Sequence, residues 1–132
     1  MKKIILLLSL VLVASCMEKE KSVSTEPGNF AHTVYFWFHN PDNMVERDAF
    51  EASLSNFLDN SEYIQTKHVG VPAATGHREV VDDSYTYSLL LTFKDKEAQD
   101  KYQDEAVHKQ FIKETSHLWT KIVIYDSENI LK

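Results

Sequence analysis

Cysteine, glycine and proline are scarce in this chain. Cys16 is the only cysteine among 132 residues, so no disulfide can form within the chain and no cluster of thiolates can hold a metal. Glycine and proline number three each, and most of them fall in two otherwise mostly polar stretches, residues 17–29 and 71–84. These two stretches are therefore expected to be a tether and a loop.

The sequence has no apolar run long enough to span a membrane permanently. A spanning helix needs about 20 apolar residues, and the N-terminal run at residues 4–14 is clearly shorter. Lys2 and Lys3 precede this run and small residues follow it, which is typical of an export signal. Val13-Ala14-Ser15-Cys16 resembles the lipobox of bacterial lipoproteins, in which the cysteine is lipidated and becomes the first residue. We therefore predict a signal peptide at residues 1–15 and lipidation of Cys16; the alternative is an ordinary secretory signal with an incidental cysteine.

The chain has fewer basic than acidic residues, 14 lysines and arginines against 20 aspartates and glutamates, so its formal net charge is −6. Removal of the signal, which contains Lys2 and Lys3, would make this charge more negative. This excludes nucleic acid as an expected partner, since proteins that bind phosphate backbones cluster lysine and arginine. The domain should not adhere to an anionic membrane by itself, so the acyl chains must supply the attachment. We predict that residues 16–29 comprise the lipidated cysteine and a flexible tether. The protein would then be a membrane-anchored lipoprotein of the cell envelope, on the periplasmic or outer-surface side.

Residues 30–132 predict one folded domain with four strands. His32, Val34, Phe36 and Phe38 alternate with Thr33, Tyr35 and Trp37, so both faces of the first strand carry large side chains. Asn43 is a candidate cap for a helix at about residues 44–59, and Asp95 for a helical segment that starts at Lys96. The remaining elements are expected at residues 63–70 (strand), 85–93 (strand, with Tyr85 and Tyr87 on one face), 105–117 (helix) and 119–125 (strand).

This order of elements predicts the α+β fold class, with a ferredoxin-like βαββαβ arrangement that places the helices on one face of an antiparallel sheet. The other face would then be bare. If Tyr35 and Trp37 lie there, a single chain would expose an aromatic patch of the kind that proteins usually cover. A homodimer in which the two sheets pack together would cover it.

Two histidines and a tyrosine are the strongest candidates for chemistry. His32 and His108 could form an acid–base pair, because imidazole titrates near neutral pH. Tyr102 or Tyr87 could donate a hydrogen bond to a carbonyl that gains negative charge. Alternatively, His32 sits inside the layer between sheet and helices, where a backbone group or a tyrosine satisfies it. The other histidines show no close ligand spacing, and the loop acids Glu79, Asp82 and Asp83 are more simply solvated than metal-binding, so no metal site is predicted.

Three segments carry a resemblance to a known family. They are residues 30–38, residues 85–93 followed by Asp95-Lys96-Glu97-Ala98, and Tyr102 with His108 and Phe111. Together they resemble the stress-responsive alpha/beta barrel (Dabb) family over residues 30–126. The resemblance implies a dimeric alpha/beta barrel and a role linked to stress, although most members have no assigned reaction.

One plant member of that family cyclises a linear polyketide without a cofactor, and its functional residues can be placed on this sequence. Its strand histidine falls on His32, its tyrosine on Tyr102 and its helix histidine on His108. A further histidine of its pocket falls on Tyr87. The family often has His-Pro-x-His before its second helix, where this chain has Glu105-Ala106-Val107-His108.

Two functions follow as hypotheses. The first is a membrane-tethered dimer that binds a small apolar or aromatic molecule, with Phe36, Tyr87, Leu89 and Phe111 as the expected lining. The second is a cofactor-independent enzyme of the lyase, cyclase or monooxygenase kind, with His32, Tyr102 and His108 as catalytic residues. Neither hypothesis requires a cofactor.

Overall fold

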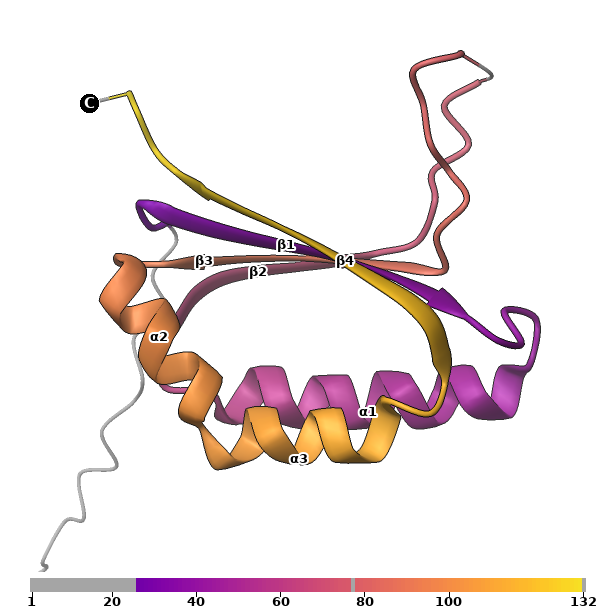
Figure 1. Ribbon diagram of the computed structural model, residues 1–132, viewed down its shortest axis with the longest axis horizontal. Coiled ribbons are helices and arrows are strands. Elements are labelled where there is room, and N and C mark those ends of the chain that lie inside the picture. Colours follow the sequence, from indigo (N-terminus) through magenta and orange to yellow (C-terminus); the bar gives the residue numbers. More distant parts are fainter. Residues whose placement is uncertain (1–25, 77, 132) are drawn as a thin grey trace, which may run out of the picture.

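A four-stranded antiparallel sheet forms one layer and three helices form the other (Figure 1). The computed structural model describes residues 26–76 and 78–131, so the predicted signal peptide, Cys16 and most of the tether lie outside the described residues. The elements in chain order are β1 (Phe30–Phe38), α1 (Met44–Asn60), β2 (Ile64–Gly70), β3 (Tyr87–Phe93), α2 (Lys96–Asp104), α3 (Ala106–Thr115) and β4 (Trp119–Glu128). The strands lie in the order β2-β3-β1-β4. The ferredoxin-like α+β prediction is therefore confirmed, with the second helical region divided into α2 and α3.

Both predicted helix caps are present. The side chain of Asn43 accepts hydrogen bonds from the backbone N–H groups of Val45 and Glu46, at 3.1 and 3.4 Å. Asp95 Oδ1 accepts from the N–H of Ala98 at 2.9 Å. These bonds satisfy backbone donors that have no partner within the first turn of a helix. They fix the start of α1 and α2 and thereby the helices that cover the sheet.

Glu105 separates α2 from α3 and ties both to the end of α1. Its backbone is not helical (φ −58°, ψ 137°), and its carboxylate accepts hydrogen bonds from the Ser61 hydroxyl and from the backbone N–H of Glu62, both at 2.6 Å. Ser61 is fully buried at the C-terminal end of α1. A carboxylate at position 105, where the family often has a histidine, thus has a structural role here.

The core lies between the helices and one face of the sheet. Phe36 of β1 contacts Phe50 of α1 and Phe111 of α3, with ring centroids 5.2 and 6.4 Å apart. The buried apolar residues of the described part all lie between Phe30 and Leu118. A chain that begins at Ser22 therefore keeps every one of these core residues.

No helix within the described part of the chain is both long and apolar enough to cross a membrane.

No helix covers the opposite face of the sheet (Figure 1), and this face carries an aromatic cluster. Tyr35 and Trp37 lie there as predicted, half-buried in the single chain, and the ring of Tyr35 also contacts Tyr125. Tyr85 corrects one prediction, because its ring lies 4.9 Å from that of Tyr35 and not on the face that Tyr87 shares with the helices. β3 begins at Tyr87, so the alternation of faces does not extend back to residue 85.

Candidate functional site

The structure brings His32, Tyr102 and His108 together, although they come from β1, α2 and α3. The ring centroid of Tyr102 lies 5.8 Å from that of His32 and 4.6 Å from that of His108. His32 and Tyr102 are almost fully buried, whereas His108 is half-buried. The three residues thus form a contiguous aromatic cluster between the sheet and the helices, and we call them the histidine–tyrosine cluster.

His32 has a carboxylate partner that sequence reasoning missed. Its Nδ1 atom lies 2.6 Å from Oδ1 of Asp126, which is about half exposed on β4. A carboxylate oxygen accepts hydrogen bonds, so the Nδ1–H group of His32 is the donor in this contact and Nε2 is the ring nitrogen that does not take part in it. The signal lies in the sequence: Asp126 continues the face of β4 that begins with Ile122 and Ile124, and it pairs directly with His32 in the register. The expected strand ended one residue too early to include it.

The surroundings set the protonation of the other two members. Burial lowers the pKa of His108, and the neighbouring His32 acts in the same direction, although a hydrogen bond to the Gln103 carbonyl opposes them. Burial raises the pKa of Tyr102 above its usual value, reinforced by the negative charges of Glu105 and Asp126. At neutral pH, His108 is therefore a neutral ring that can accept a proton, and Tyr102 remains a phenol that can donate a hydrogen bond.

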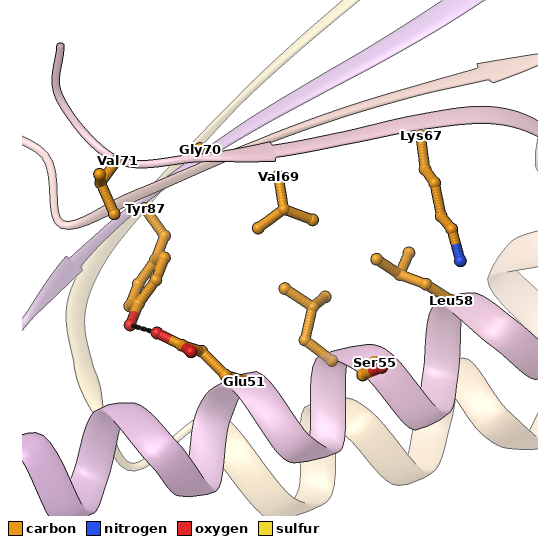
Figure 2. A pocket seen from close by; sticks show the side chains of 9 residues that line it. Glu51, Ser55, Leu58, Lys67, Val69, Gly70, Val71 and Tyr87 are labelled. Atoms are coloured by element: carbon orange, nitrogen blue, oxygen red, sulfur yellow. Dashed lines mark hydrogen bonds between the residues drawn. The ribbon is translucent and has the colours of Figure 1, made fainter.

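A groove of about 630 Å³ opens beside the core, between α1 and the edge strand β2 (Figure 2). Its apolar lining comes from Leu54 and Leu58 of α1 and from Val69 of β2, and Tyr87 of β3 contributes a phenol. Ser55 and Gly70 also line it, and their small size leaves the space between helix and strand unfilled. Val69 faces the helix side, because it pairs with the buried Leu89, yet it remains 41% exposed.

The four residues predicted to line a ligand site do not all line the groove in the structure. Tyr87 lines the groove, whereas Phe36, Leu89 and Phe111 are buried in the core between sheet and helices. Contact of those three with a ligand stays a prediction. Glu51, Lys67 and Val69 line the groove and were not anticipated, because a groove depends on the distance between α1 and β2, which no local sequence pattern encodes.

The tyrosine in the groove is held by two charged residues of α1. Arg47 Nε donates to the Tyr87 hydroxyl at 3.0 Å, and that hydroxyl donates to Oε1 of Glu51. Burial, together with the hydrogen bond to Glu51, raises the pKa of Tyr87 to about 12. The phenol is therefore neutral and fixed in position.

Within residues 26–76 and 78–131, no three histidine, cysteine or acidic side chains are arranged to hold a metal ion.

The chain is similar to one protein family and to several solved structures. The model of the stress responsive A/B barrel domain matches residues 30–129. A Dabb family protein with a ferredoxin-like fold from Mesorhizobium loti superposes with a TM-score of 0.63 at 18% identity, covering 76% of this chain and 96% of that one. No protein with a curated description matches the chain.

Two further solved structures share the fold. A hydroxynitrile lyase from Passiflora edulis is 17% identical with a TM-score of 0.64, covering 81% of this chain and 99% of that one. A dimeric ferredoxin-like protein of unknown function from Thermobifida fusca is 11% identical with a TM-score of 0.62, covering 76% of this chain and 90% of that one. At identities of 11%, 17% and 18%, the likeness to these three solved structures shows a shared fold alone.

Proposed function

Because the chain belongs to the stress responsive A/B barrel domain (Dabb) family, we propose that it is a membrane-tethered homodimer that binds a small apolar or aromatic molecule. The groove between α1 and β2 is the observation that carries the proposal. Its volume of about 630 Å³ falls within the usual range for small-molecule sites, and an apolar lining with a few fixed polar groups is typical of them.

Filling the groove tests the binding proposal. We expect Val69→Trp to weaken binding of the neutral fluorescent probe N-phenyl-1-naphthylamine at least about tenfold, because the indole would occupy the apolar space that the probe needs. Fluorescence titration of a chain that begins at Ser22 measures the affinity. Val45→Trp is the control, since Val45 is 78% exposed on α1 and lies outside the groove. Equal affinities for the native chain and Val69→Trp would contradict the proposal.

Attachment to the envelope depends on Cys16 in this proposal. We expect Cys16→Ser to remove lipid labelling and to move the protein from the membrane fraction to the soluble fraction, because the acidic domain supplies no attraction to an anionic bilayer. Metabolic labelling with a palmitate analogue and cell fractionation measure the two effects. Retention of both by the variant would refute the lipid anchor.

The aromatic cluster on the bare face supports the homodimer. Tyr35, Trp37 and Tyr125 present their rings on a side of the sheet that no element of the described chain covers. The segment between β2 and β3 rises on this same side (Figure 1), so a second copy on the sheet would lie beside it. The Thermobifida fusca protein that shares the fold is dimeric, which supports a homodimer here.

Catalysis without a cofactor is the second candidate function, and the contact between His32 and Asp126 favours it. A carboxylate that orients a histidine through Nδ1 leaves Nε2 for proton transfer, as in other acid–base sites. In this candidate function His32 and His108 handle protons and Tyr102 hydrogen-bonds the substrate oxygen. The hydroxynitrile lyase among the structural neighbours suggests a cyanohydrin as the first substrate class to test.

Cyanide release is the measurement for this second function. In cyanohydrin cleavage a base takes the hydroxyl proton, the bond to the nitrile carbon breaks, and the cyanide that leaves with the electron pair is protonated. We expect His32→Ala and His108→Ala each to reduce release about 100-fold or more, in line with the contribution of a general base. His117→Ala, at an exposed histidine outside the histidine–tyrosine cluster, should retain the native rate. Equal rates in all variants, or no release by the native chain, would exclude this reaction.

A further inference from the structure

Glu51 stands at one end of the groove in a fixed position. Figure 2 shows its side chain reaching from α1 toward the Tyr87 hydroxyl, which donates to its Oε1 atom. The same hydroxyl accepts a hydrogen bond from Arg47, so the phenol is held from two sides. A carboxylate can accept several hydrogen bonds, and one contact to Tyr87 leaves acceptor capacity for a ligand. Glu51 is therefore an exposed but oriented acceptor at the groove's end.

The charge at this end is not neutralised by an ion pair. Glu51 and Lys67 are the two charged residues that line the groove, and Lys67 is already paired, with its Nζ atom 2.6 Å from Oδ1 of Asp59. Among the described residues, no cation lies within ion-pair distance of Glu51. Arg47 does not line the groove, and its guanidinium packs over the Tyr87 ring and donates to the carbonyl of Pro41.

The surface beside this carboxylate is apolar. Leu54, Leu58 and Val69 line the groove together with Glu51, and Figure 2 shows Leu58 and Val69 among the side chains of this lining. We infer that the groove selects molecules in which an apolar chain or ring carries a positively charged amine, with the amine at Glu51 and the apolar body on these three side chains. This inference rests on the proposed binding function and names its ligand class. A ligand carboxylate at the same place would be repelled, because like charges at contact distance disfavour binding.

Competition between matched amphiphiles tests this selection. Decylamine, decan-1-ol and decanoate share an apolar chain and differ in the charge of the head group. In displacement of N-phenyl-1-naphthylamine from the chain that begins at Ser22, at low salt and neutral pH, decylamine should bind about threefold to fivefold tighter than the alcohol, as expected for an exposed ion pair. Decanoate should bind more weakly than the alcohol, and added salt should reduce all these differences.

Variants of two acids on the same helix separate a specific contact from general attraction to an acidic protein. Glu51→Gln should abolish the preference for the amine, so that decylamine and decan-1-ol displace the probe with equal affinity. Asp48→Asn removes the same charge from an exposed position outside the groove, so its preference should equal that of the native chain. Persistence of the preference in Glu51→Gln would overturn the inference.

The outcomes distinguish this inference from the proposed function. If all three amphiphiles displace the probe with equal affinity, or if decanoate binds best, the groove is a binding site but does not select amines. If none displaces the probe and the probe itself does not bind, the proposed function fails and the inference fails with it.

Discussion

Phe50→Ala is expected to lower the free energy of unfolding by about 3–5 kcal/mol, the range observed when a buried phenylalanine is truncated. Phe50 is fully buried on the face of α1 that meets the sheet. A change of this size is a large part of the total stability of a domain of this length.

The expected loss is large because five aromatic rings surround this side chain. Their centroids lie between 4.8 and 6.4 Å from that of Phe50, and the rings belong to β1, β3, α3 and β4 (Phe36, Phe38, Tyr87, Phe111 and Trp119). Strand pairing and helix packing hold these neighbours in place, so they cannot collapse into the space that alanine leaves. Phe50 thus joins the helix layer to three of the four strands.

Urea unfolding followed by circular dichroism measures this prediction. Val45→Ala is the control, because Val45 lies on the same helix but is 78% exposed, and its truncation should change stability by less than about 0.5 kcal/mol. A loss below about 1 kcal/mol for Phe50→Ala would mean that the aromatic core repacks around the cavity, contrary to the contacts described.

Local patterns predict this core well. Phe50, Leu54, Phe57 and Leu58 recur at helical spacing within residues 44–59, and these four are the buried residues of α1. Alternation in β1 likewise placed His32, Val34 and Phe36 on the helix side. Periodicity succeeds here because each element buries one face and exposes the other, so the sequence within the element carries the information.

Long-range geometry explains what the sequence did not reveal. The partnership of His32 with Asp126 requires the register between β1 and β4, which are 94 residues apart at this pair. The groove requires the separation of α1 from β2. Tyr85 was misplaced because it lies just outside β3, where the alternation of faces no longer holds. The histidine–tyrosine cluster was anticipated through the family resemblance, since no periodic pattern connects residues 32, 102 and 108.

Trp37→Glu is expected to convert the proposed homodimer into a folded monomer. Trp37 lies on the bare face of the sheet, where its indole N–H donates to the Ser84 hydroxyl at 3.0 Å and the Lys121 amine lies 4.1 Å from the ring centroid. In the single chain it is half-buried, so packing against a second sheet would bury the rest of the ring. The substitution removes this apolar surface and places a carboxylate where the partner would exclude water.

Taking a charged carboxylate out of water costs several kcal/mol even when a lysine lies beside it, so the dimer dissociation constant should rise at least about 100-fold. The monomer should still fold, because position 37 faces away from the core and the glutamate can pair with Lys121. Sedimentation equilibrium measures the association, and circular dichroism checks the fold. Trp37→Phe retains an aromatic ring without the charge and should stay dimeric. An unaltered dimer in Trp37→Glu would show that the two copies meet through another surface, and the aromatic cluster would then need a different occupant.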